Sequence, residues 1–279
     1  MSTSGAAPIT VGVDDSQHAA LVFAAEEARI QGCAVRVVHG FIVPPSPPQA
    51  MSAAYGVDIE GSFRESGREV LADAVQYLTS RYGDVTVEQV LERGPASRVL
   101  IDASATSRLL VLGQDDATPW YSRLFRSRVS RDLTVDALCP VVVVPDTWST
   151  RTPADGVTLL LDQRSSATGA VRFAFEHASR HDGTLHAVHV GDTGTREGPD
   201  MRTLVDSWCA RYPDVQVATS VVPGAPDPST VTSFARTGLL VLGRPREHLL
   251  PGLPDKSLAR AVLEHAGCPV AVVPDDHDV

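Results

Sequence analysis

The sequence repeats itself, and this repeat limits the fold more than any single motif does. Five segments of the first half recur about 130 to 150 residues later. They are VGVDDS at 11–16 and LLLDQR at 159–164, VRVVHG at 35–40 and LHAVHV at 185–190, RYGDV at 81–85 and RYPDV at 211–215, LLVLG at 109–113 and 239–243, and CPVVVVP at 139–145 and CPVAVVP at 268–274. One fold is written twice. We therefore expect a first domain at 1–146 and a second at 147–279, each of ordinary size for a single domain.

Apolar residues alternate between strand spacing and helix spacing along each copy. In the first copy the pattern predicts strands at 9–13, 35–39 and 85–91, with a first helix that Gly32 closes. The runs LLVLG and VVVV are too apolar for a sheet with one solvent-exposed face. They are therefore expected to be parallel strands that are buried on both faces of the sheet. This order predicts an α/β fold with an open, doubly wound parallel sheet in each copy.

Ligands of doubly wound sheets bind beyond the carboxyl ends of the strands, where the strand order reverses. Four residues with binding chemistry fall at such ends in this sequence. They are Asp14, Gly113, Asp162 and Gly243.

Charge and composition exclude several classes of function. The formal net charge of −10 repels phosphate backbones and anionic lipids, so neither nucleic acid nor a membrane is an expected partner. The first ten residues lack the pattern of a signal peptide, and no apolar run approaches the ~20 residues of a membrane span. A soluble, cytoplasmic protein is expected.

The sequence offers no catalytic or metal-binding motif. The four cysteines form no CxxC pair, so buried, reduced thiols are expected instead of a zinc or redox site. HExxH, GxSxG and Walker loops are absent from the sequence. His39 and His189 end equivalent strands, but neither has an acidic or nucleophilic partner at a diagnostic spacing, which favours structural roles. We therefore expect a protein that is not an enzyme.

In order and spacing, these motifs resemble the universal stress protein family over nearly the whole chain. The segments that carry the resemblance are VGVDDS, the VHG and VHV strand ends, LLVLG, VSRDLTVDALCPVVVVP and LARAVLEHAGCPVAVVP. The resemblance implies two tandem five-stranded sheets of the adenine-nucleotide alpha-hydrolase-like type, with dimerisation through the last strand. In a tandem chain we expect 141–144 and 270–273 to pair in an intramolecular pseudo-dimer. The alternative is two independent domains on a flexible linker. A homodimer and an unidentified regulatory protein are the other expected partners.

The family divides into members that bind ATP and members that do not, according to a glycine loop of the form G-x2-G-x9-G-[S/T]. The glycines let backbone amides approach the phosphates, and a helix N-terminus completes the anion site. In the first copy Gly113 is kept, but Asp116 stands at the second glycine. Ser127 and Arg128 stand at the third glycine and at the hydroxyl position, and Ser130 matches a serine one turn into the last helix. The alternative for Ser130 is an ordinary helix residue.

The second copy departs from the glycine loop in a different way. Gly243 and Ser257 are kept at the right spacing, but Arg246 and Lys256 replace the other two glycines. These cations either bind phosphate in place of the lost amides or are simply solvated. Loss of strong ATP binding is favoured for the second copy, and both interpretations stay open for the first.

Asp14 is evidence for a nucleotide site in the first copy. In ATP-binding relatives an aspartate at the end of the first strand contacts the nucleoside, and Asp162 matches it in the second copy. The alternative is that Asp14 caps the following helix. ATP is the one cofactor that the resemblance implies, in the first domain before the second.

Two hypotheses of function follow from the sequence. The leading one is a non-catalytic regulatory or binding protein of the stress response, with degraded ATP-binding loops. The alternative is an ATP-binding nucleotide sensor that hydrolyses slowly and uses the N-terminal domain.

Overall fold

A computed structural model describes ten stretches of the chain. They are residues 6–14, 17–43, 58–114, 133–150, 156–161, 168–190, 201–222, 234, 237–244 and 258–275. The chain forms two compact units, Met1–Ala137 and Leu138–Val279. The last strand of the first sequence repeat therefore packs in the second unit. The division at 146 that the repeat predicts concerns the two copies of the sequence, and it stays a prediction.

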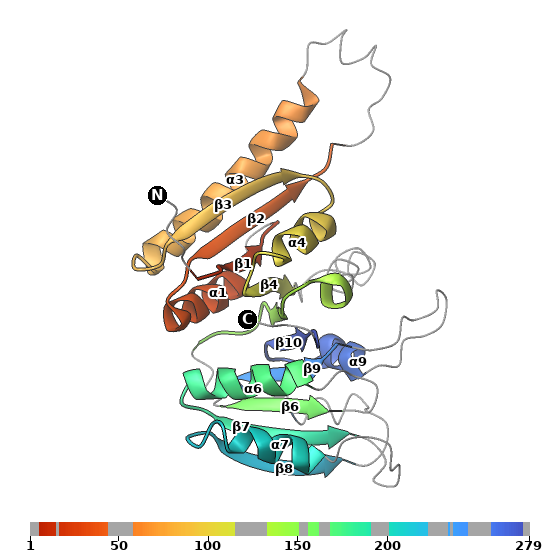
Figure 1. Cartoon of the computed structure of the whole chain (residues 1–279). Coiled ribbons are helices and arrows are strands. Elements are labelled where there is room, and N and C mark those ends of the chain that lie inside the picture. Colours follow the sequence, from red (N-terminus) through yellow and green to blue (C-terminus); the bar gives the residue numbers. More distant parts are fainter. Residues whose placement is uncertain are drawn as a thin grey trace, which may run out of the picture. The chain divides into compact units, whose positions relative to one another are not determined.

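In the part of the first unit that the structure describes, four strands form a parallel sheet and helices lie in the connections between them (Figure 1). Its elements are β1 Ile9–Gly12, α1 His18–Gln31, β2 Val35–Phe41, α3 Ile59–Arg81, β3 Val87–Arg93, α4 Ala96–Ser104 and β4 Leu109–Gln114. The strand order is β3-β2-β1-β4. Ile9 of β1 lies opposite Val35 on one side and Leu109 on the other. The predicted α/β fold is confirmed.

The direction of chain winding reverses after β3. From β1 the chain moves outward to β2 and β3, and then returns across the sheet to β4 beside β1. Because such crossovers are right-handed, helices on the outward and return paths cover opposite faces. Accordingly α1 contacts α3, whereas α4 packs against β1 and β2. The reversal lies between β1 and β4.

Two helix ends of the first unit, the end of α1 and the start of α3, have residues suited to those positions. Gly32 ends α1 in the left-handed conformation, with φ 61°, and its N–H bonds the last turn, as predicted. Asp58 caps α3 by accepting a hydrogen bond of 2.8 Å from the Gly61 N–H. The third strand begins at Val87 and not at Val85 as predicted, because Val85 N–H donates to Tyr82 O at 3.0 Å in the turn after α3.

The second unit repeats this winding and adds the strand β5 beside β10. Its elements are β5 Val141–Pro145, β6 Val157–Leu161, α6 Thr168–Arg180, β7 Thr184–Val190, α7 Met201–Cys209, β8 Gln216–Val222, β9 Leu239–Gly243, α9 Leu258–His265 and β10 Val270–Val273. The strand order is β5-β10-β9-β6-β7-β8. β6 lies between β7 and β9 just as β1 lies between β2 and β4. Each sequence repeat thus contributes five described strands, as expected.

β5 is the added strand, and it runs antiparallel to β10. Val142 lies opposite Ala271, and every residue of β5 is buried. The predicted pairing of 141–144 with 270–273 is therefore observed. The wider expectation, a pseudo-dimer of the two sequence copies, stays a proposal.

One apolar cluster holds the second unit together on the side of α9. It joins β6, β7, β9, β10 and α9 through ten buried residues. They are Leu160, Val188, Val190, Leu240, Leu242, Ala259, Val262, Cys268, Val270 and Val272.

None of the described helices combines the length and the apolar character that a membrane span requires.

The pairing of β5 with β10 makes a prediction for Val142. Val142→Pro removes a backbone N–H from a buried strand, which a sheet interior does not tolerate. Val142→Ala is the matched control, because it removes only buried methyl groups and should cost about 2 kcal/mol. The proline variant should unfold at a clearly lower temperature than the alanine variant in a calorimetric scan. Equal midpoints for the two variants would contradict the strand assignment.

Candidate functional site

The candidate site lies at the carboxyl ends of β1 and β4, where the strand order of the first unit reverses. After Gly12 the chain passes through Val13 and Asp14, and α1 begins with Gln17 at its N-cap position. Gly113 stands at the corresponding end of β4. Parallel strands end at the same edge of a sheet, so the topology brings Asp14, Gln17 and Gly113 together.

Asp14 and Gln17 are joined by a hydrogen bond. Gln17 Nε2 donates to Asp14 Oδ1 at 2.7 Å. Asp14 is exposed, whereas Gln17 is half-buried. The N-cap position belongs to Gln17, whose side chain makes no capping hydrogen bond. Asp14 lies three residues before that position and accepts a hydrogen bond from the Gln17 amide.

Gly113 permits the close approach of Gln17 to the end of β4. A Cβ atom on Gly113 would lie 3.0 Å from both Cβ and Cγ of Gln17. That separation is shorter than ordinary van der Waals contact. A larger residue at 113 would therefore push the Gln17 side chain away from the strand end.

His39 borders the site but is held by the backbone. Its Nδ1 lies 2.7 Å from Val13 O, and because a carbonyl only accepts, Nδ1 carries the proton. The ring also packs against Gly67 of α3, where a Cβ would lie 3.0 Å from His39 Cδ2. These contacts support the structural role that the sequence favours for His39.

Most of the other candidate residues lie outside the described residues. They are Ser127, Arg128, Ser130, Asp162, Lys256 and Ser257. Gly243 is described: it is buried at the end of β9, opposite Val273 of β10. Its place in the second unit corresponds to that of Gly113 in the first. Of the predicted site residues that the structure describes, Asp14 and Gly113 lie together, and Gln17 joins them.

Burial makes three of the cysteine thiols poor nucleophiles. Burial raises the pKa of Cys268 to about 12, and it also raises the pKa of Cys33 and Cys209. A thiol with a raised pKa is protonated at neutral pH and unreactive. Cys139 and Cys268 are buried as expected, but Cys33 and Cys209 are only half-buried.

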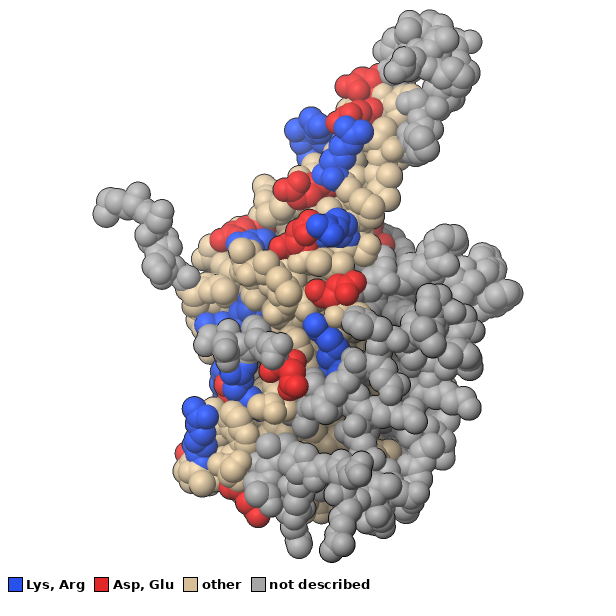
Figure 2. Space-filling view, turned by 45° about the vertical axis from the view of Figure 1, so that its right-hand side comes forward, with Lys and Arg blue, Asp and Glu red and all other residues tan. Residues whose placement is uncertain are grey.

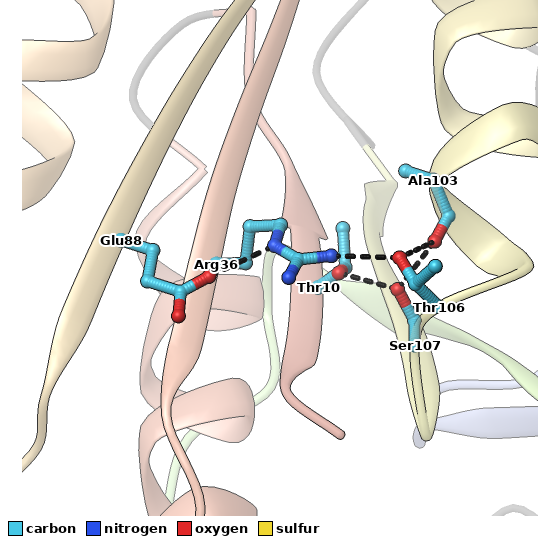
Figure 3. A network of polar contacts seen from close by, with 6 residues as sticks. All are labelled: Thr10, Arg36, Glu88, Ala103, Thr106 and Ser107. Atoms are coloured by element: carbon cyan, nitrogen blue, oxygen red, sulfur yellow. Dashed lines mark hydrogen bonds and ion pairs between the residues drawn. The ribbon is translucent and has the colours of Figure 1, made fainter. Parts of the chain in front are cut away.

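A polar network on the α4 side of the first unit was not predicted from the sequence (Figure 3). Arg36 of β2 donates to Glu88 of β3 and to the Thr106 hydroxyl, each at 3.0 Å. The Ser107 hydroxyl donates to Ala103 O, so the Thr10 hydroxyl must donate in its 2.6 Å bond to Ser107. The network ties three strands to the turn after α4, which indicates a structural role.

A shallow groove of about 700 Å³ lies between α3 and β3. Its lining includes Arg64, Arg68 and Arg93. Arg64 and Arg93 both pair with Glu60, and Arg68 pairs with Glu65. Figure 2 shows acidic and basic side chains interspersed over this part of the surface. Glu92 also lines the groove, so three carboxylates offset the three guanidinium groups, which argues against an anion site there.

Comparison with known proteins gives consistent results for sequence and fold. The profile of the universal stress protein family matches residues 6–145. A universal stress protein of Mycobacterium tuberculosis is 28% identical over 285 residues, which cover 95% of each chain. One of Mycobacterium bovis is 29% identical over 308 residues, which cover 96% of each chain.

Solved structures give a similar result. The crystal structure of a universal stress protein from Archaeoglobus fulgidus superimposes with a TM-score of 0.72 over 98% of each chain, at 16% identity. A universal stress protein structure from the same organism, in complex with dAMP, covers 49% of this chain and 95% of its own. It is 26% identical, with a TM-score of 0.34.

The bond between His39 and Val13 O predicts an effect on stability. His39→Ala leaves a partly buried carbonyl without its donor, so the free energy of unfolding should fall by about 1–3 kcal/mol. His39→Asn keeps a donor near the position of Nδ1 and should recover part of the loss. Urea denaturation measures both variants. A stability of His39→Ala equal to that of the unmodified chain would refute the structural role.

Proposed function

Because the chain belongs to the universal stress protein family, we propose that it is a non-catalytic regulatory protein whose first unit binds an adenine nucleotide. The observation that carries the proposal is the hydrogen-bonded pair of Asp14 and Gln17 beside Gly113, at the reversal of strand order. Binding is read out through an unidentified protein partner. Turnover of the nucleotide is not part of the function.

The nucleoside end of the ligand supplies most of the affinity in this proposal. The Asp14 carboxylate is an exposed acceptor at the edge where doubly wound sheets bind ligands. The sequence after β4 has lost the glycines that would let amides surround a phosphate, and it carries Asp115 and Asp116 instead. Two carboxylates repel a triphosphate at close range. The phosphates are therefore held weakly.

The groups around the site do not form a hydrolytic arrangement among the described residues. The Nδ1 atom of His39 is held by Val13 O, and Asp14 Oδ1 is held by the Gln17 amide. General acid–base catalysis requires a group within hydrogen-bond reach of the reacting proton, with a base and a nucleophile in mutual contact. The described residues offer no such pair at this edge.

The second unit acts as a structural partner in this proposal. Its loop keeps Gly243 and Ser257 but has Arg246 and Lys256 at the other glycine positions. Pro245, Pro251 and Pro254 also lack the backbone N–H that a phosphate would need. The antiparallel pairing of β5 with β10 supports the proposal that the two sequence copies form a pseudo-dimer.

Isothermal titration tests the proposed function directly. Mg-ATP and adenosine should both bind, with dissociation constants within about tenfold of each other, because the phosphates contribute less than about 1.4 kcal/mol. A phosphate-release assay run beside the titration should match the protein-free blank. Absence of heat with either ligand at millimolar concentration would contradict nucleotide binding. Steady release of phosphate would favour the hydrolysing sensor instead.

Asp14 should matter for binding more than for stability. Asp14→Ala removes a charged acceptor, which is worth about 1.5–3 kcal/mol, so ATP affinity should fall by tenfold or more. The melting temperature should hardly change. Asp102→Ala is the matched control, because Asp102 is an exposed carboxylate on α4 that pairs with Arg98. Equal ATP affinity of Asp14→Ala and Asp102→Ala would exclude the role of Asp14 in binding.

A further inference from the structure

Two histidines lie side by side at the end of α6 in the second unit. His177 and His181 are four residues apart, and the His181 N–H donates to His177 O at 3.1 Å. Their rings stack, with centroids 4.0 Å apart and planes inclined by 22°. Residues four apart lie on the same face of a helix. Both imidazoles therefore project from one side of α6.

The surrounding structure holds both rings in place. The helix ends directly after His181, because Asp182 has φ 48° and the Gly183 N–H bonds back to the last turn. Phe173, one turn earlier, stacks on His177 with ring centroids 6.0 Å apart. His177 is buried, with 8% of its surface exposed, whereas His181 is more exposed. A ligand that enters beside His181 therefore meets a preformed pair.

Two imidazoles at this spacing can chelate one metal ion. Ring nitrogens of His177 and His181 lie within 4.8 Å of each other. Two nitrogens on one tetrahedral Zn²⁺ are about 3.3 Å apart, because each Zn–N bond is about 2.0–2.1 Å long. Small rotations of the two side chains close this difference. Imidazole suits Zn²⁺, Ni²⁺ and Cu²⁺, whereas Mg²⁺ and Ca²⁺ prefer oxygen ligands. The chemistry of the pair therefore selects a transition metal.

The position at the end of a helix also favours a cation. The last carbonyl groups of a helix have no partner within it and carry a partial negative charge. His177 lies in the last turn of α6, and His181 follows the last helical residue, Arg180. A divalent ion held by the pair would therefore lie close to these carbonyl groups.

The spacing of the pair is that of the two zinc ligands in an HExxH helix. The sequence at 177–181 is HASRH, and in HExxH the two histidines bind zinc from one helix face. Ala178 stands where that motif has the glutamate that acts as the general base. The pair can therefore bind a metal, but it lacks the base that hydrolysis by such a site requires.

The first sequence copy has a different pair at the same helical positions. The segments FAAE of α1 and FAFE of α6 correspond, so Glu27 takes the place of His177. Gln31 takes the place of His181, and its Nε2 donates to Glu27 at 2.9 Å. Both helices thus place two polar side chains four residues apart. In the second copy both of these side chains are nitrogen ligands.

We propose that His177 and His181 bind a divalent transition-metal ion of the Zn²⁺ class at the end of α6. The inference goes beyond nucleotide binding and does not depend on it. Structural zinc sites are closed by four protein ligands, whereas two histidines leave coordination positions open to water. The bound ion therefore exchanges with the solvent, and it gives the second unit a ligand of its own.

Calorimetric titration of Zn²⁺ into the full chain is the first test. His181→Gln removes one nitrogen ligand at the more exposed position, so Zn²⁺ affinity should fall by about tenfold or more as chelation is lost. His265→Gln is the matched control, because His265 is an exposed histidine in the last turn of α9. It should keep the affinity of the unmodified chain. Equal affinity of the two variants, or no Zn²⁺ binding by the unmodified chain at millimolar concentration, would overturn the site.

The second test uses His177→Phe and measures melting temperature with and without Zn²⁺. This variant keeps an aromatic ring beside Phe173 and removes the other nitrogen ligand. Zn²⁺ should raise the melting temperature of the unmodified chain, because a ligand that binds the folded state stabilises it by mass action. The same addition should leave His177→Phe unchanged, whatever its own melting temperature. A rise of the same size in both proteins would show that the ion binds elsewhere and would refute the inference.

Discussion

The first unit depends on β1 being paired on both sides. Ile9 faces Val35 and Leu109 at once, and the ladder continues in step to Gly12. Hydrogen bonds to two neighbours fix where β1 ends, and so where Val13 leaves the sheet. The Val13 N–H then donates to Val38 O, and the Val13 carbonyl accepts from His39. Because this exit from the sheet is fixed, the short turn that follows can hold Asp14 and Gln17 in hydrogen-bond contact.

The sequence predicts elements well where one local signal suffices, and poorly where distant residues decide. Apolar runs and the left-handed Gly32 give β1, β4 and the end of α1. The start of β3 was misplaced by two residues, because the turn at Tyr82 occupies the first apolar position. Gln17 could not be recognised as a site residue from its neighbours alone. Its placement depends on the missing side chain of Gly113 at the end of another strand. The Arg36 network likewise joins residues that lie 52 and 70 positions apart.

The two units share one winding but differ in their sheet edges. β3 carries Glu88, Glu92 and Arg93, whereas β8 has the uncharged sequence QVATSVV. Charged residues on an edge strand discourage unwanted pairing with other chains. The first unit thus combines a charged edge strand with the hydrogen-bonded pair of Asp14 and Gln17. The second unit combines an uncharged edge strand with β5, which belongs to the first sequence repeat. The two sequence copies therefore differ both at the edge strand and at the candidate site, which is consistent with different functions for the two copies.

Because β5 comes from the first sequence repeat but packs in the second unit, the sheet of the second unit can be completed only late in synthesis. β5 leaves the ribosome before any other strand of the second unit, yet its partner β10 is the last strand to be made, about 130 residues later. Domains generally fold as they emerge, but this one cannot complete its sheet until translation is almost finished. Until β10 emerges, neither β5 nor β9 has its β10 partner, so the second unit reaches its full sheet only after β10 has left the ribosome.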